Sequence, residues 1–142
     1  MTTKTIQDWM TSNTITVSGN TSLPDAYRLM IDNKLRRVPV MENDDLVGIV
    51  TLGDLRRGDP PVGLDLDLLK TVEKLSKMTV HQVMSRNVHT ISSTEFLVDA
   101  AHKMLKHSVR VLPVLDAKKL VGVISRSDIL RAFIVFEGEN RQ

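Results

Sequence analysis

The chain has 142 residues, of which 42% are apolar, and a formal net charge of only +2. The apolar fraction is enough for a folded core and excludes a disordered chain, while the absence of cysteine excludes disulfides, thiolate metal sites and a cysteine nucleophile and fits a cytoplasmic protein. Because the N-terminus is polar and the most apolar C-terminal run covers only residues 129–136, we expect neither a signal peptide nor a membrane span.

The first part of the chain predicts strands and helices in alternation. The periods of its apolar residues predict a helical turn at 6–10, strands at 15–17, 37–41 and 46–50, and a helix at about 22–34. The apolar stripe of that helix consists of Leu23, Ala26, Tyr27, Met30 and Ile31. A second helix is expected to begin near Leu52, directly after the last of these strands.

The middle of the chain differs from the rest. Gly and Pro interrupt residues 58–63, and apolar residues at every third position then predict a linking helix at about 66–78. The remaining elements repeat those of the first part, with a helical turn at 80–84, strands at 89–91, 111–115 and 120–124, and helices at about 94–107 and 126–136.

This similarity is an internal duplication. Residues 6–57 align with residues 80–131 without a gap, and sixteen positions are identical. A gapless match of this length indicates that one supersecondary unit was built twice. We therefore expect an α/β (α+β) fold of two β-α-β-β-α repeats, packed sheet to sheet with internal pseudo-two-fold symmetry. The expected domains are repeat 1 at 1–57, a linker at 58–78 and repeat 2 at 79–142.

Each repeat contains the same strand-to-helix turn, Gly48 to Asp54 and Gly122 to Asp128, with a hydroxyl residue three positions before the aspartate. Helix capping alone can account for Thr51 with Asp54 and for Ser125 with Asp128. A ligand site is the alternative, because free N–H groups at a helix start bind anions and an aspartate can accept both hydroxyls of a ribose. The sequence alone leaves both interpretations open.

Catalytic and metal sites have little support in this sequence. Its four histidines do not form a ligand cluster, and no Ser-His-Asp arrangement or nucleophile turn is visible. We expect no catalytic residue, no metal and no enzyme activity.

The duplication, the two turns and the strands with Val38-Pro39-Val40 and Leu112-Pro113-Val114 resemble a tandem pair of CBS domains, or Bateman module. The linking helix is similar to that of small stand-alone bacterial CBS-pair proteins, including relatives of acetoin-utilisation proteins. The resemblance implies a non-catalytic sensor that binds AMP, ADP, ATP or S-adenosylmethionine between its repeats, forms a homodimer and acts on a separate effector protein.

The resemblance also implies roles for residues. The aspartates Asp54 and Asp128 would hold the ribose, and Thr51 and Ser125 would lie near the phosphates. The base pocket would be lined by Leu35, Arg36, Arg37, Val109, Arg110 and Val111, with Ile15 and His89 from the first strand of each repeat.

The two turns differ in charge, because repeat 2 has Arg126 where repeat 1 has Leu52. Arg126 could pair with a phosphate, so we expect the Ser125–Asp128 site to be the better nucleotide site. The alternative is that Arg126 is simply an exposed side chain in the first turn of the helix.

Two other functions compete with the sensor. One is a nucleic-acid-associated protein, whose basic face would consist of Arg36, Arg37, Arg110, Arg126 and Arg131. Scattered Lys and Arg pairs and few aromatic residues count against it. The other is an interaction scaffold with empty clefts, in which the two turns serve only as helix caps.

Overall fold

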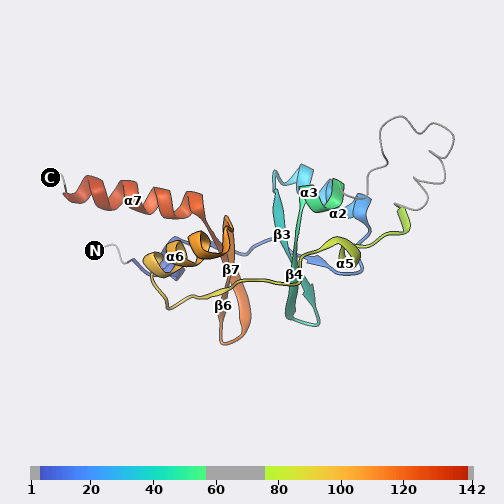
Figure 1. Ribbon diagram of the computed structural model, residues 1–142, viewed down its shortest axis with the longest axis horizontal. Coiled ribbons are helices and arrows are strands. Elements are labelled where there is room, and N and C mark those ends of the chain that lie inside the picture. Colours follow the sequence, from blue (N-terminus) through green and yellow to red (C-terminus); the bar gives the residue numbers. More distant parts are fainter. Residues whose placement is uncertain (1–3, 57–75, 141–142) are drawn as a thin grey trace. The chain divides into compact units, whose positions relative to one another are not determined.

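The computed structural model describes residues 4–56 and 76–140, which form two compact units (Figure 1). The first-repeat unit comprises residues 15–56 and 76–88, and the second-repeat unit comprises residues 4–14 and 89–140. The linking helix predicted at 66–78 lies almost entirely outside the described residues.

The first-repeat unit is built on a three-stranded sheet with the order β2-β3-β4. Its strands are β2 (Val17–Ser18), β3 (Arg37–Glu42) and β4 (Asp45–Thr51), and its helices are α2 (Leu23–Asp32), α3 (Leu52–Arg56) and α5 (Val80–Val83). Strand β2 runs parallel to β3, which pairs antiparallel with β4. Asn43 and Asp44 both have positive φ, which suits the tight turn between two twisted strands.

The second-repeat unit has a four-stranded sheet with the order β1-β7-β6-β5. Its strands are β1 (Thr11–Ser12), β5 (Ile91–Ser92), β6 (Val111–Asp116) and β7 (Lys119–Ser125), and its helices are α1 (Ile6–Trp9), α6 (Leu97–His107) and α7 (Arg126–Asn140). The mixed α/β class and the repeated β-α-β-β-α order are thus confirmed. The strands predicted at 15–17 and 89–91 begin two residues later, and the last helix extends past residue 136 to Asn140.

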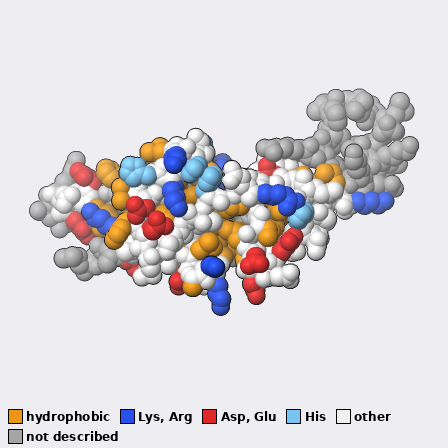
Figure 2. Space-filling model, turned by 60° about the horizontal axis from the view of Figure 1, so that its bottom comes forward, with side chains coloured by type: hydrophobic (Ala, Val, Ile, Leu, Met, Phe, Trp, Pro, Cys, Tyr) orange, Lys and Arg blue, Asp and Glu red, His pale blue; other side chains and the backbone are white. Residues whose placement is uncertain are grey.

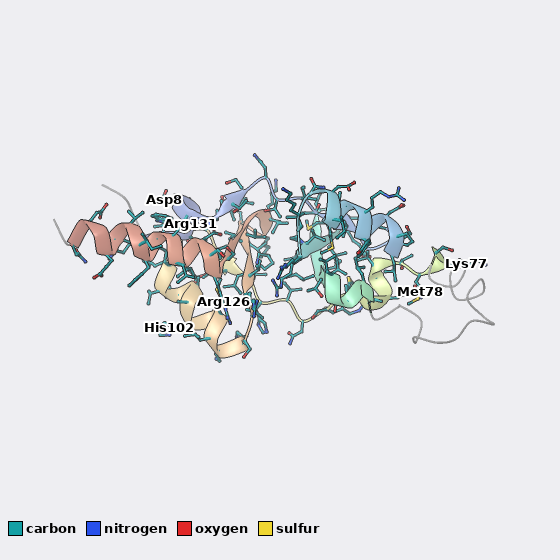
Figure 3. All side chains as sticks on the ribbon, turned by 90° about the horizontal axis from the view of Figure 1, so that it is seen from above. Asp8, Lys77, Met78, His102, Arg126 and Arg131 are labelled. Atoms are coloured by element: carbon teal, nitrogen blue, oxygen red, sulfur yellow. The ribbon has the colours of Figure 1, made fainter. Side chains whose placement is uncertain are left out.

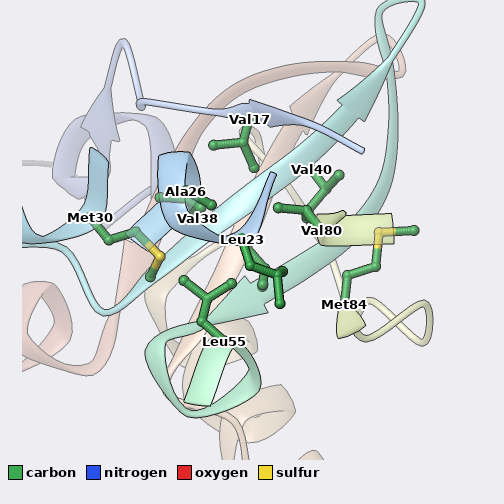
Figure 4. Packing of buried hydrophobic residues seen from close by; sticks show 10 residues of the cluster. Val17, Leu23, Ala26, Met30, Val38, Val40, Leu55, Val80 and Met84 are labelled. Atoms are coloured by element: carbon green, nitrogen blue, oxygen red, sulfur yellow. The ribbon is translucent and has the colours of Figure 1, made fainter. Parts of the chain in front are cut away.

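Each unit has its own cluster of buried apolar side chains. In the first-repeat unit, α2 contributes Leu23, Ala26 and Met30 to this cluster (Figure 4). The prediction that Tyr27 and Ile31 belong to the buried stripe is wrong, because these side chains are 42% and 48% exposed. A short helix on a small sheet buries only a narrow stripe, so residues at its edge face solvent.

The compact units do not coincide with the sequence repeats, because each unit takes its first short helix from the other repeat. Helix α1 belongs to the second-repeat unit, where the Ile6 N–H donates to Glu95 O at 2.9 Å. Helix α5 belongs to the first-repeat unit, where the Val80 N–H donates to Thr21 O at 2.9 Å. The side chains of Ile6 and Val80 are fully buried in their respective clusters. The exchange is therefore part of both cores.

The glycine that opens each turn motif makes room for the exchanged segment. Thr11 pairs with Val123 and Ser85 pairs with Ile49, at equivalent positions of the two units. A Cβ atom on Gly48 would lie 2.8 Å from the carbonyl oxygen of Ser85, and one on Gly122 would overlap that of Thr11. Only glycine allows these backbones to approach so closely.

Candidate ligand site

The two strand-to-helix turns have matching geometry. In the first-repeat unit, the Thr51 N–H donates to Asp54 Oδ2 at 2.9 Å, and the Asp54 N–H donates to Thr51 Oγ1 at 3.0 Å. In the second-repeat unit, the Ser125 N–H donates to Asp128 Oδ2 at 2.9 Å, and the Asp128 N–H donates to Ser125 Oγ at 3.2 Å. Both turns are complete reciprocal caps, which satisfies donors that the first helical turn leaves without partners.

The aspartates of these caps are buried, with exposed fractions of 6% for Asp54 and 3% for Asp128. In addition to its cap, Asp128 accepts an ion-paired hydrogen bond on Oδ1 from Arg131 Nη2, one turn further along α7. Arg131 itself is exposed (it is labelled with Arg126 in Figure 3). The buried carboxylate of Asp128 is therefore held at both oxygens by groups of its own unit.

Residues 35–37 and 109–111 precede Pro39 and Pro113 and form the pre-proline segment of each unit. Both segments lie directly beside the turn. The Leu52 N–H donates to Arg36 O and the Arg126 N–H donates to Arg110 O, both at 3.0 Å. On the neighbouring strand, Arg37 pairs with Thr51 and Val111 pairs with Ser125.

Helix ends fix the start of each pre-proline segment. The Leu35 N–H donates to Met30 O at 2.8 Å, and the Val109 N–H donates to Met104 O at 3.1 Å. Within each unit the structure thus brings together the turn and the pre-proline residues predicted for one site.

The position held by Leu52 in one turn and Arg126 in the other also differs in its contacts. Arg126 is exposed, and its Nε donates to Val109 O at 3.3 Å, so its cationic side chain lies along the pre-proline segment. Leu52 is partly buried and packs against the apolar cluster of the first-repeat unit. One turn therefore carries a positive charge beside the helix start, and the other carries an apolar side chain.

The predicted first-strand residues Ile15 and His89 are half-buried and lie just before β2 and β5. The imidazole of His89 stacks on that of His107, with ring centroids 3.6 Å apart and an angle of 13° between the planes. Sequence reasoning missed His107, because the two residues are far apart along the chain and no local pattern relates a strand start to a helix end. The pKa of His107 is lowered from 6.5, first by partial burial and then by its Coulomb interactions with His89, Lys106 and Lys103.

Other kinds of site receive no support from residues 4–56 and 76–140. No group of three or more His, Asp or Glu side chains gathers there as a metal site would require. Among these residues, every helix is too short or too polar to cross a bilayer.

Comparison with solved structures finds close likenesses. The complex of CBSX2 with AMP, a CBS-pair protein of Arabidopsis thaliana, is 31% identical and superposes with a TM-score of 0.79, covering 95% of this chain and 99% of the other. The CBS domain pair of protein MJ0100, in complex with 5-methylthioadenosine and S-adenosylmethionine, is 27% identical with a TM-score of 0.72, covering 92% and 96%.

Sequence comparison points the same way. A CBS domain-containing protein of Dictyostelium discoideum is 34% identical over 131 residues, which span 91% of this chain and 90% of the relative. Three relatives named as enzymes are much longer, and the chain spans 23% of each. The family model of the CBS domain matches twice, at residues 6–60 and 80–135. The chain therefore belongs to the CBS domain family and carries two CBS domains in tandem.

Proposed function

We propose that this protein is a non-catalytic regulatory module that binds an adenosine-containing ligand, namely AMP, ADP, ATP or S-adenosylmethionine, at its two CBS repeats. The observation that carries this proposal is the likeness to CBSX2 in complex with AMP over nearly the whole of both chains. The likeness to the MJ0100 pair, bound to 5-methylthioadenosine and S-adenosylmethionine, supports the same ligand class. Ligand binding would bias the conformation of the pair, and a separate effector protein in the cytoplasm would respond to that bias.

In this proposal each site combines the turn with the pre-proline segment of the same unit. Asp54 and Asp128 accept hydrogen bonds from the ribose hydroxyls, while Thr51 and Ser125 lie beside the phosphates. The hydrogen bonds from the first helical residue to Arg36 O and Arg110 O support this grouping, because they hold turn and segment side by side. The base pocket is lined by Leu35, Arg36 and Arg37 with Ile15, and by Val109, Arg110 and Val111 with His89.

The Ser125–Asp128 site is proposed as the stronger phosphate site. Arg126 lies along the pre-proline segment through its contact with Val109 O, and its guanidinium supplies the charge that Leu52 lacks.

The proposed active form is a homodimer. Helices α6 and α7 expose large apolar side chains, namely Val98, Leu105, Leu130, Phe133 and Ile134. A shallow pocket of about 300 Å³ opens on the same two helices and is lined in part by Phe133 and Phe136. A second copy of the chain would cover this surface with an identical one, as a two-fold interface requires. Light scattering that gave the monomer mass at micromolar concentration would contradict the dimer.

The deciding experiment has two stages. Mass spectrometry of small molecules carried through purification identifies bound ligands, and thermal denaturation with adenosine, AMP, ADP, ATP and S-adenosylmethionine measures stabilisation of the ligand-free protein. We expect at least one of these compounds to raise the melting temperature in a concentration-dependent manner. We expect Asp128→Ala to weaken AMP binding more than Asp54→Ala, and the opposite order would refute the ranking of the two sites.

A scaffold with empty sites is the second candidate, and one observation favours it: both aspartates are buried and already bonded within their caps. A panel without any thermal shift would favour the scaffold over the sensor. The nucleic-acid alternative gains no support from Figure 2, where Lys and Arg side chains on the visible face are dispersed among acidic and hydrophobic ones.

A further inference from the structure

The last two turns of α6 hold the segment before β5 through two contacts. Lys103 Nζ donates to Thr90 O at 2.7 Å, and the ring of His107 stacks on that of His89. Lys103 and His107 are four positions apart, so both side chains lie on the same face of the helix. This face therefore fixes both the backbone at Thr90 and the side chain of His89.

The first-repeat unit has no equivalent among its described residues. The aligned positions of His89, Lys103 and His107 hold Ile15, Leu29 and Asn33. Asn33 Nδ2 donates instead to Leu29 O within its own helix, at 2.8 Å. The stacked pair is thus a property of the second repeat, where Arg126 also lies.

The charged groups around His107 are basic. His89 faces it from the segment before β5, and Lys103 and Lys106 belong to its own helix. Arg126, at the start of α7, contacts Val109 O two residues further along. Two neutral imidazole rings stack without electrostatic cost, whereas a proton on each would place like charges about 3.6 Å apart in this basic setting.

We propose that His107 is a positioning residue of the second-repeat ligand site, whose neutral ring orients His89 against the ligand and releases it when His107 is protonated. This inference rests on the proposed function, because it assigns His89 to the ligand. It predicts that ligand binding at the second repeat weakens in mild acid, whereas binding at the first repeat, with Ile15 and Asn33, does not.

The direction of the pH effect follows from the lowered pKa of His107. Well above pH 6.5 the ring is neutral in the folded and the unfolded chain, and the stack is complete. As the pH falls through 6.5, His107 takes up a proton more readily when its ring is apart from His89 than when the two rings are stacked. The stacked arrangement therefore becomes less favourable. Ligand affinity at this site therefore falls toward acid pH.

The test is calorimetric titration of the 142-residue chain with adenosine, which has no phosphate to titrate, from about pH 8 to about pH 5.5. Asp54→Ala serves as the background, so that the second-repeat site is observed alone. We expect the affinity to fall about three- to tenfold across this range. An affinity independent of pH would overturn the proposal.

Two substitutions of His107 separate positioning from titration. His107→Asn replaces the imidazole ring with the side chain of the aligned residue Asn33. We expect this variant to bind weakly at both about pH 8 and about pH 5.5. In His107→Phe, an aromatic ring that cannot be protonated remains, and we expect the affinity at neutral pH to persist in acid. The proposal fails if His107→Asn retains the pH profile of the parent chain.

A ligand-free measurement keeps this inference separate from the proposed function. In NMR spectra, we expect protonation of His107 to change the chemical shifts of the His89 ring protons through the stack, and His107→Asn to remove this component of the change. If the His89 resonances respond to His107 in this way and no adenosine compound binds, the sensor function is wrong while the stacked pair stands. If adenosine binds and the His107 variants keep the pH profile of the parent chain, only the positioning role is wrong.

Discussion

The two units share their backbone and differ in the side chains around it. Both form the same reciprocal cap, with hydrogen bonds of 2.9–3.2 Å between a hydroxyl residue and an aspartate. Both also place a glycine where a segment of the other repeat approaches. Around the cap, however, the second-repeat unit has Arg126 and the stacked His89 and His107, where the first has apolar or amide side chains. Duplication has kept the groups that build the turn and changed several of the side chains around it.

The largest expected effect tests the shared part of this comparison. Gly122→Ala forces a methyl group onto the backbone of Thr11, and we expect it to lower the free energy of unfolding by about 2–3 kcal/mol, the usual cost of overpacking. Gly48→Ala should act in the same direction. Gly138 is the matched control, because a Cβ there meets no atom within 4 Å and alanine favours the helix by about 0.5–1 kcal/mol. Urea unfolding measures all three, and a harmless Gly122→Ala would contradict the exchanged packing.

A smaller effect is expected at the ion pair of the second unit. Arg131→Met removes the partner of Asp128 Oδ1 and leaves a buried carboxylate with fewer hydrogen bonds. Because Arg131 is itself exposed, we expect a loss of only about 1–2 kcal/mol in the free energy of unfolding. Arg126→Leu, which removes an equal charge from the same helix, should change stability by less than about 0.5 kcal/mol. Equal losses in the two variants would mean that the pair with Asp128 contributes nothing specific.

Arg126→Leu tests the chemical difference between the repeats directly, because it installs the residue of the first repeat. We expect AMP binding at the second site to weaken about fivefold and adenosine binding to stay unchanged, since the guanidinium acts on the phosphate. Calorimetry in the Asp54→Ala background measures both affinities. Equal weakening of AMP and adenosine would show that Arg126 shapes the pocket and does not bind phosphate.

The smallest effect concerns stability in mild acid. Since the pKa of His107 is lowered in the folded protein, the unfolded chain binds more protons as the pH falls below 6.5, and stability declines. We expect the urea midpoint of the ligand-free chain to decrease from about pH 7.5 to about pH 5.5, and His107→Asn to reduce that decrease. If the urea midpoint of His107→Asn fell as much as that of the parent chain, a group other than His107 would be responsible for the loss of stability.

Local patterns account well for what was predicted correctly. The apolar spacing around Leu23 and Met30 predicted α2, and the hydroxyl-to-aspartate spacing predicted the caps of α3 and α7, because these patterns involve residues one helical turn apart. The exposure of Tyr27 and Ile31 was predicted wrongly, since the width of a buried stripe depends on the surface that the helix meets. The roles of Asp54 and Asp128 toward a ligand remain predictions.

By itself, the sequence determined the duplication, the order of the elements, the reciprocal caps and the charge difference between Arg126 and Leu52. Each of these depends on identities or spacings that can be read along the chain. Only the tertiary structure decided that α1 and α5 are exchanged between the units, that Gly48 and Gly122 serve this exchange, and that His107 meets His89. These contacts join segments distant in sequence, and nothing in the local pattern of either partner encodes which segment will cover it.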